Sequence, residues 1–192
     1  MNLNSPTLLN AVLLPTILAL SNAQTLGKER ASTFEGGSAM SLAVTTTAFS
    51  AGGSIPKSYT CDGPDTSPDL SWSGAPAGVQ SFALIADDPD APVGTWTHWL
   101  IWNIPLHSTG LPKDVPKNET LGDGTRQGRN DFRRIGYGGP CPPPGKPHRY
   151  FFRLFALDRR LDLKAGAGRN ELELEMKGHV LAQGELMGKF GR

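Results

Sequence analysis

Charged and polar side chains that could do chemistry gather at four places along this chain of 192 residues. The first is the acidic sequence DDPDAP at positions 87–92, which directly follows an apolar run. Because Asp88 and Ala91 each precede a proline, both are biased toward an extended backbone, so the carboxylates of Asp88 and Asp90 are held in a stiff turn. Taken alone, the segment is more typical of an ordinary acidic turn.

His98 marks the second place. It lies within the run THWLIWNI at positions 97–104, where strict alternation would put it on one strand face with Leu100, Trp102 and Ile104. A single histidine on an apolar face is more often a packed core residue than a ligand. The position of His98 alone therefore does not identify a site.

The third place is the sequence GYGGPCPPPG at positions 136–145. Glycines allow backbone N–H groups to approach a ligand closely, and consecutive N–H groups can form a concave anion-binding nest. The prolines stiffen the segment and donate no hydrogen bonds. A rigid surface loop is the alternative interpretation, and this stretch alone does not exclude it.

The fourth place is the start of the run HRYFFRLFAL at positions 148–157. Alternation puts His148 and Tyr150 on one face of this segment and Arg149 on the other. His107 and His179 lack polar neighbours of this kind, so we interpret them as structural.

Four segments are predicted to form the strands that position these residues: 42–47, 81–86, 97–104 and 150–157. The last is apolar on both alternating faces apart from Arg153, as expected for a strand inside a sandwich. The 23 glycines and 16 prolines indicate many turns and long, shaped loops. Together these features predict a β-rich fold.

The sequence ELELEM at positions 171–176 is ambiguous. Its alternation favours a strand, whereas Asn170 could cap a helix whose Leu172 and Met176 lie one turn apart on the same face. The local pattern leaves both open. A second short helix is expected around 180–187, after Gly178.

Composition and charge exclude several classes of protein. Hydrophobic residues make up 38% of the chain and charged residues 19%, which is ordinary for a folded domain, and 192 residues suit one domain. The net charge is +1 and we find no basic tract, so nothing in the charge pattern recruits nucleic acid.

The first 23 residues carry no charged side chain. The apolar run LLNAVLLPTILAL at positions 8–20 is as long as the core of a signal peptide and short for a membrane span, and Ser21 and Ala23 fit a cleavage site. We predict a signal peptide at 1–23, a flexible linker at 24–40 and a domain at 41–192, with the mature protein periplasmic or secreted and without a membrane span. A buried N-terminal helix is the alternative, since no Lys or Arg precedes the run.

The four places occur in a specific order: DPDAP, WTHW, GYGGPCPPPG and HRY. This order resembles the phosphatidylethanolamine-binding protein family, and its cysteine-bearing motifs resemble the bacterial Raf-kinase-inhibitor-like branch. The resemblance covers 151 positions, 42–192, and includes YTCDG at 59–63, SP at 67–68, LSW at 70–72, NDF at 130–132 and GELMG at 184–188.

The resemblance implies a fold and a ligand site. The fold would be mainly β, a Greek-key β-sandwich with a few short peripheral helices, and residues 171–176 would then be helical. The site would be a small pocket for a phosphate-like anion at one end of the sandwich. The matching positions are Asp88, Asp90, Pro92, Trp96, His98, Gly138, Pro140, His148 and Tyr150. The family also implies a cis peptide bond between Ala91 and Pro92.

Cys61 and Cys141 are the two cysteines of the chain. Export would make a disulfide between them chemically reasonable, and the resemblance places both loops toward the pocket end. Two cysteines 80 residues apart cannot make a zinc site alone. Cys141 also stands where animal relatives carry a second proline, which leaves the fine ligand preference open.

We expect an exported protein that binds a small phosphorylated or other anionic ligand, without cofactor or metal, and that is not an enzyme. One alternative is a protein-interaction module that inhibits a protease or kinase, although export argues against the kinase partners of animal relatives. Another is a metal-assisted hydrolase, but the chain has neither an HExxH nor a GxSxG motif. Bacterial relatives are often dimers, so a homodimer is a further expectation.

Overall fold

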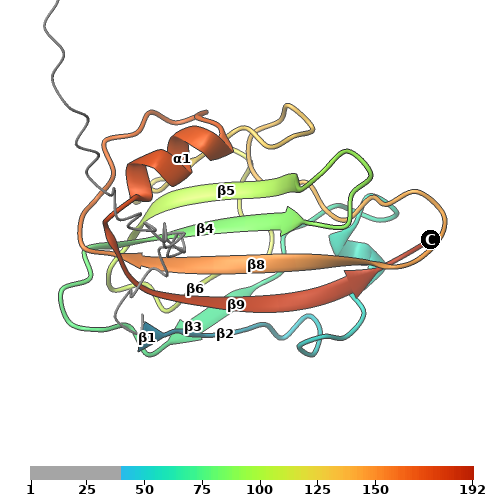
Figure 1. Ribbon diagram of the computed structural model, residues 1–192, viewed down its shortest axis with the longest axis horizontal. Helices are drawn as coiled ribbons and strands as arrows, with labels where there is room; N and C mark the ends of the chain where they lie inside the picture. Colours follow the sequence, from blue (N-terminus) through green and yellow to red (C-terminus); the bar gives the residue numbers. More distant parts are fainter. Residues whose placement is uncertain (1–39) are drawn as a thin grey trace, which may run out of the picture. The chain divides into compact units, whose positions relative to one another are not determined.

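The computed structural model describes residues 40–192. Two sheets pack face to face (Figure 1): a six-stranded sheet in the order β1-β9-β8-β4-β5-β7 and a three-stranded sheet in the order β2-β3-β6. The strands are β1 (Met40–Ser41), β2 (Ala43–Thr45), β3 (Leu70–Ser73), β4 (Ser81–Asp88), β5 (Trp96–Pro105), β6 (Gly110–Leu111), β7 (Arg126–Gln127), β8 (His148–Leu157) and β9 (Val180–Phe190). One 3-10 helix, η1 (Lys57–Tyr59), and one α-helix, α1 (Arg169–Met176), complete the fold.

This architecture confirms the predicted mainly-β sandwich. All strand pairs are antiparallel except β1 with β9. The four predicted strands correspond to β2, β4, β5 and β8, of which β2 is shorter than expected. Within residues 40–192 no helix is long and apolar enough to cross a membrane.

The N-terminal predictions fall almost entirely outside the described residues. This applies to the signal peptide at 1–23 and to linker residues 24–39. Met40, the last residue of the predicted linker, already pairs with Ala182 in the β1–β9 ladder. Met40 therefore belongs to the folded domain, although the prediction assigned it to the linker.

Two apolar clusters explain why β4 is buried along its whole length. The larger cluster lies between the sheets and joins Leu84 of β4 and Phe152 of β8 to Trp72 of β3. The smaller cluster lies on the opposite face of the six-stranded sheet, where Ile85 meets Leu172 of α1. A strand that is covered on both faces has a continuous apolar sequence, and β4 shows this pattern.

The ambiguous segment at 171–176 belongs to helix α1, as the family resemblance implies. Leu172 and Met176 are 0% and 4% exposed, whereas Leu174 is 73% exposed. In a strand all three would share a face, so their burial follows the helical period instead. The helix begins at Arg169, with Gly168 as the N-cap, so the predicted cap at Asn170 is wrong by two residues.

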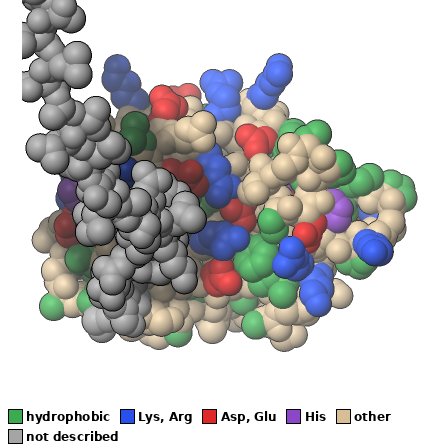
Figure 2. All heavy atoms as spheres, viewed as in Figure 1, with side chains coloured by type: hydrophobic (Ala, Val, Ile, Leu, Met, Phe, Trp, Pro, Cys, Tyr) green, Lys and Arg blue, Asp and Glu red, His purple; other side chains and the backbone are tan. Residues whose placement is uncertain are grey.

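Helix α1 is also tied to the sheet by charges. Acidic and basic side chains alternate across the middle of the face that Figure 2 shows. The buried carboxylate of Asp87 accepts hydrogen bonds from Arg153 at 3.3 Å and Arg169 at 2.9 Å, and these arginines also pair with Glu185 and Glu173. The first aspartate of the acidic turn is therefore structural.

The short helix expected at 180–187 is wrong: residues 180–190 form β9, which pairs with β8 over its whole length. Glycine lowers helix propensity, and a side chain at Gly184 would collide with the carbonyl oxygen of Leu42. The buried side chains of Ala182, Leu186 and Phe190 are separated by even numbers of residues, as a strand requires.

Strict alternation along β5 is also interrupted. Asn103 has a φ of 57°, and its side chain accepts from the Leu161 N–H at 2.7 Å and donates to the Leu161 carbonyl at 3.0 Å. Beyond this irregularity Ile104 faces the larger cluster, whereas Trp102 faces the smaller one. The prediction that Trp102 and Ile104 share a face is therefore wrong.

Candidate ligand-binding site

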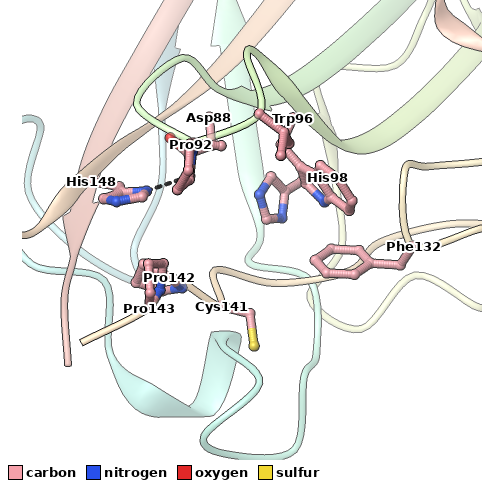
Figure 3. A pocket seen from close by; sticks show the side chains of 11 residues that line it. Asp88, Pro92, Trp96, His98, Phe132, Cys141, Pro142, Pro143 and His148 are labelled. Atoms are coloured by element: carbon pink, nitrogen blue, oxygen red, sulfur yellow. Dashed lines mark hydrogen bonds and ion pairs between the residues drawn. The ribbon is translucent and has the colours of Figure 1, made fainter. Parts of the chain in front are cut away.

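A cavity of about 200 Å³ opens where the β4–β5 turn, the start of β8 and the glycine- and proline-rich loop meet (Figure 3). Most of its walls are apolar, and the polar side chains among them are Asp88, His98 and His148. The lining residues are Asp88, Ala91, Pro92, Val93, Trp96, His98, Phe132, Cys141, Pro142, Pro143 and His148. The volume suits a small chemical group, since pockets for drug-sized ligands are roughly 300–1,000 Å³.

Asp88 and His148 form a hydrogen-bonded pair at this cavity. Asp88 ends β4 and His148 begins β8, and because these neighbouring strands are antiparallel, both residues lie at the same end of the sheet. Nδ1 of His148 lies 2.8 Å from Oδ2 of Asp88, and the side chains are only 12% and 5% exposed. Oδ1 of Asp88 accepts from the backbone N–H of Asp90 at 2.8 Å. With Nδ1 donating to Asp88, Nε2 is the imidazole atom of His148 left for a ligand.

A β-bulge turns His98 toward the cavity. Ala86 pairs with Trp99 and Asp87 pairs with Thr97, so His98 is an extra residue in the β4–β5 ladder. Its ring packs edge-to-face against the ring of Tyr150, with centroids 5.2 Å apart. Tyr150 belongs to the larger apolar cluster, which also contains Trp99. The expectation that His98 shares a face with Leu100 and Trp102 is wrong because a bulge re-aims the side chain it inserts.

The environment of His98 fixes its hydrogen positions. Nδ1 lies 2.6 Å from the carbonyl oxygen of Gly138, which can only accept, so Nδ1 carries a hydrogen. The ring is 4% exposed, and burial lowers the pKa of His98. His98 is therefore a neutral imidazole near pH 7, with an unprotonated Nε2.

The backbone N–H groups of Gly138 and Gly139 do not serve as the anticipated anion donors. Gly138 N–H donates to the carbonyl oxygen of His98 at 2.9 Å, and Gly139 N–H donates to Oδ1 of Asp65 at 2.6 Å. A Cβ at Gly138 would lie 2.8 Å from the ring of Phe132. These glycines permit close packing of the loop beneath the cavity instead.

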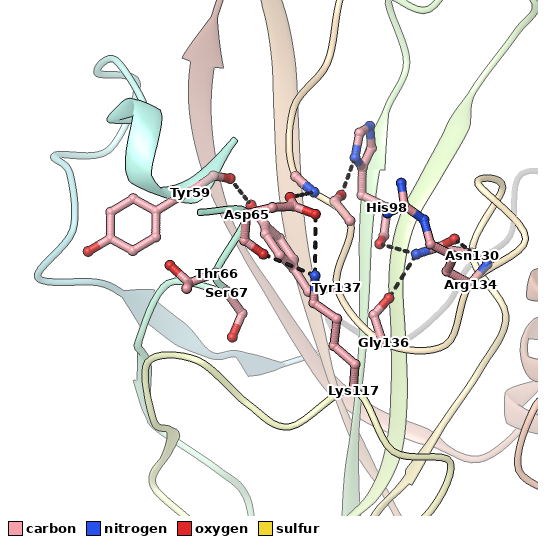
Figure 4. A network of polar contacts seen from close by, with 12 residues as sticks. Tyr59, Asp65, Thr66, Ser67, His98, Lys117, Asn130, Arg134, Gly136 and Tyr137 are labelled. Atoms are coloured by element: carbon pink, nitrogen blue, oxygen red, sulfur yellow. Dashed lines mark hydrogen bonds and ion pairs between the residues drawn. The ribbon is translucent and has the colours of Figure 1, made fainter. Parts of the chain in front are cut away.

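Polar contacts hold this loop in place (Figure 4). Asp65 links the segment after η1 to Gly139 and to Lys117, whose Nζ lies 3.3 Å from Oδ2. Tyr137 donates to the carbonyl oxygen of Tyr59 at 2.7 Å, and Nδ2 of Asn130 donates to that of Gly136 at 2.9 Å. The network supports Gly138, which in turn orients His98.

Asp90 is not among the residues that line the cavity. Its carboxylate binds Arg149 through Nη2 at 2.7 Å, Nε at 2.9 Å and the backbone N–H at 2.9 Å. The hydrogen bonds from the Arg149 side chain hold the pKa of Asp90 down at about 2. Asp90 thus fastens the β4–β5 turn to the start of β8, next to His148, which makes it a supporting residue.

Tyr150 and Pro140 also support the cavity instead of lining it. Pro140 accepts a hydrogen bond from the Cys61 N–H at 3.1 Å. The hydroxyl of Tyr150 is buried and lacks a partner among the described residues. Burial, assisted by the charge of Asp88, raises the pKa of Tyr150, so the hydroxyl remains a donor.

Trp96 lines the cavity, and its buried Nε1–H also lacks a partner among residues 40–192. The buried indoles of Trp72 and Trp102, which belong to the two core clusters, share this property. An unpartnered indole is therefore not specific for a ligand in this fold.

The peptide bond between Ala91 and Pro92 is trans, contrary to expectation, and none of the described residues has a cis peptide bond. The trans form is the lower in energy before proline by about 0.5–1 kcal/mol. The turn closes instead through a hydrogen bond from the Gly94 N–H to the Ala91 carbonyl at 3.1 Å. Gly94 has a φ of 98°, a conformation that favours glycine.

Several lining residues were not predicted. Phe132 packs edge-to-face on both Trp96 and His98, with ring centroids 5.4 Å apart in each case. It belongs to the NDF motif noted in the sequence, but nothing in the local pattern shows that this loop folds over His98. Val93, Pro142 and Pro143 form apolar walls, and Val93 is 77% exposed at the cavity.

Cys61 and Cys141 are joined by a disulfide, with Cα atoms 5.4 Å apart. Cys141 lines the cavity, and Cys61 follows η1 in the segment that Asp65 also anchors. The bond therefore ties the proline-rich wall of the cavity to the η1 segment.

Comparisons with known proteins identify the family. The sequence profile of the phosphatidylethanolamine-binding protein family matches residues 45–191. A UPF0098 protein of Methanothermobacter thermautotrophicus is 54% identical over 147 residues, which cover 77% of this chain and 97% of that protein. A UPF0098 protein of Aquifex aeolicus is 49% identical over 161 residues, covering 83% and 93%.

Solved structures of the same family are also similar to this chain. The crystal structure of Escherichia coli YbcL, described as a member of the mammalian PEBP family, has a TM-score of 0.74 at 35% identity and covers 79% of this chain and 98% of that one. A phosphatidylethanolamine-binding protein homologue of Chlamydia trachomatis has a TM-score of 0.72 at 37% identity, covering 80% and 99%. The chain belongs to the phosphatidylethanolamine-binding protein family.

Proposed function

We propose that this protein is exported and binds a small phosphate-like anion, free or as the head group of a larger molecule, without catalysing a reaction. The observation that carries the proposal is the Asp88–His148 pair at a cavity with otherwise mostly apolar walls. Burying a carboxylate is costly unless it has a hydrogen-bonding partner, so a buried carboxylate–imidazole pair beside a cavity is a candidate for ligand contact.

The pair can receive an anion through His148. When the imidazole is protonated, its Nδ1–H donates to Asp88 and its Nε2–H becomes a charge-assisted donor to an oxyanion. The cavity of about 200 Å³ exceeds one phosphate group, and the apolar walls can accommodate an alkyl portion.

Export rests on two features. The charge-free, apolar residues 1–23 resemble a signal peptide. The Cys61–Cys141 disulfide is a bond that persists mainly in oxidising compartments. The apolar N-terminal segment and the disulfide both fit a periplasmic or secreted location.

Isothermal titration calorimetry of the exported protein with inorganic phosphate and with phosphoethanolamine tests the ligand class. We expect saturable binding of at least one of them, with one site per chain. If neither ligand produces saturable heat at millimolar concentration, the proposed function is wrong.

A protein-interaction role is a second candidate, because the exposed side chain of Val93 stands at the cavity beside Pro142 and Pro143. Such a partner would cover the cavity and compete with phosphate. Affinity capture from the native host, with and without added phosphate, distinguishes this role from simple ligand binding.

A further inference from the structure

The Cys61–Cys141 disulfide lies at the surface of the protein. Both cysteines are exposed, and Cys141 also lines the cavity. A thiolate from solution can therefore reach a sulfur atom while the chain stays folded. Exposed disulfides are more readily reduced than well-protected structural ones, and labile or regulatory bonds are found among them. The bond thus meets the first requirement for thiol exchange, which is access.

A guanidinium group lies against both sulfur atoms. Nη2 of Arg192 is 2.7 Å from Sγ of Cys61 and 3.3 Å from Sγ of Cys141. Asp62 orients this side chain by accepting from Nε at 2.9 Å, and its charge offsets part of the charge of Arg192. The sulfurs of a disulfide are neutral, so the cation gains a charged partner only when the bond breaks and a thiolate forms. A neighbouring arginine favours the thiolate form of cysteine.

The two Arg192–sulfur distances differ, and this difference gives exchange a direction. In thiol–disulfide exchange a thiolate attacks one sulfur, the other sulfur leaves, and the better-stabilised thiolate leaves faster. Because Arg192 lies nearer to Cys61, Cys61 is the better leaving group. The sulfur under attack is then that of Cys141.

The proline-rich wall that follows Cys141 has few other ties to the domain. The four prolines among residues 142–147 have no N–H to donate. Within residues 40–192, the one hydrogen bond of this stretch runs from the Gly145 N–H to the Arg192 carbonyl at 3.3 Å. Residues 138–140, by contrast, are each hydrogen-bonded through the backbone to another segment. Breaking the disulfide therefore releases residues 141–147 and leaves the loop beneath the cavity in place.

We propose that Cys61–Cys141 is a reversible exchange site for low-molecular-weight thiols, and that its oxidation state controls the order of the cavity wall formed by residues 141–147. A thiolate RS⁻ attacks Sγ of Cys141, the Cys61–Cys141 bond breaks, and Cys61 leaves as a thiolate beside Arg192. A second RS⁻ attacks the external sulfur of the mixed disulfide, which releases RSSR and the Cys141 thiolate, and the latter takes a proton from water. The protein is reduced by two electrons while two thiols are oxidised to RSSR, and RSSR reverses both steps. No step involves a bound anion, so this site is independent of the proposed function.

Reduction of the folded, oxidised protein by glutathione tests access. N-ethylmaleimide traps the products at successive times without denaturant, and intact mass gives the initial rate at several glutathione concentrations. We expect the rate to rise in proportion to the glutathione concentration and the product to keep its native circular dichroism. A rate that equals the rate of global unfolding and does not depend on glutathione would show a purely structural bond and overturn the proposal.

Peptide mapping of the earliest trapped product tests the direction of attack. We expect glutathione on Cys141 and N-ethylmaleimide on Cys61. The reverse placement would overturn the assignment of Cys61 as the leaving group.

Two substitutions test the role of Arg192. Arg192→Gln should slow the initial rate roughly three- to tenfold, because the leaving thiolate loses a charge-assisted donor. Lys189→Gln is the matched control, since Lys189 is an exposed cation near the end of β9 that donates to neither sulfur in the hydrogen bonds of residues 40–192. Equal slowing in both folded variants would show a general effect of charge and overturn the role of Arg192.

Amide hydrogen exchange, measured by NMR on the oxidised and the reduced protein, tests control of the wall. We expect the Gly145 amide to lose protection on reduction, whereas the Gly138 and Gly139 amides keep theirs because their partners do not depend on the disulfide. Equal protection of Gly145 in both states would overturn control of the wall by the disulfide. A loss of protection throughout the domain would show unfolding in place of a local release, and would overturn it as well.

Discussion

Nδ1 of His148 lies 2.8 Å from Oδ2 of Asp88, although the two residues are 60 positions apart in the sequence. The contact exists because β4 ends where β8 begins, and it fixes which imidazole nitrogen is free. The strand pairing of the fold thereby sets the chemistry of the cavity.

His148→Ala should weaken phosphate binding by about ten- to a hundredfold, because hydrogen bonds to charged groups contribute about 1.5–3 kcal/mol. Calorimetry measures the change, and circular dichroism checks the fold. His107→Ala is the matched control, since His107 is exposed on the turn that follows β5. Equal losses in both variants would show that the effect is not local to the cavity.

The stability of the protein should fall as the pH drops below about 6.5, the pKa of an unfolded histidine. Burial lowers the pKa of folded His98, so in this range the unfolded chain binds a proton that the folded chain does not. The free energy of unfolding should then decrease by up to about 1.4 kcal/mol per pH unit until the folded-state pKa is reached. His98→Asn should have a shallower pH dependence in urea unfolding between about pH 7 and pH 5.

The mature protein should begin near Gln24 if residues 1–23 are a cleaved signal peptide. Intact mass spectrometry of material from the periplasm or medium of the host checks the cleavage. A full-length chain confined to the cytoplasm would contradict export.

The local sequence predicts the strands that carry the site but not the direction of every side chain. β4, β5 and β8 could be predicted because their apolar runs are continuous. The predicted residues Asp88, His98 and His148 do line one cavity. The face of His98, however, depends on a bulge in the pairing of β5 with β4, which is a non-local property.

The contacts of two other segments also depend on strand pairing. Asp90 could bind a ligand or an arginine, and the register that brings Arg149 to it is set by β8. The segment from Val180 to Phe190 becomes a strand because β8 offers it a full hydrogen-bonding edge. A short window of sequence decides neither the partner of Asp90 nor whether residues 180–190 form a helix or a strand.

Leu172→Ala should lower the free energy of unfolding by about 2–5 kcal/mol, because the side chain is fully buried against the six-stranded sheet. Leu174→Ala is the matched control on the same helix, since Leu174 is 73% exposed and its truncation should have little effect. Urea unfolding measures both. Similar effects of the two substitutions would contradict the helical burial pattern of α1.

Replacing both cysteines, Cys61→Ser with Cys141→Ser, should lower stability by roughly 4 kcal/mol, because the disulfide closes a loop spanning a sequence separation of 80. Urea unfolding of the variant and of the oxidised wild type measures the difference, and reducing agent should affect only the wild type. Thiol titration of the unfolded, unreduced wild type should find no free thiol. The variant should also bind phosphate more weakly, since Cys141 lines the cavity and loses its tie to the η1 segment. Unchanged stability together with two titratable thiols in the exported wild type would show that the bond does not form.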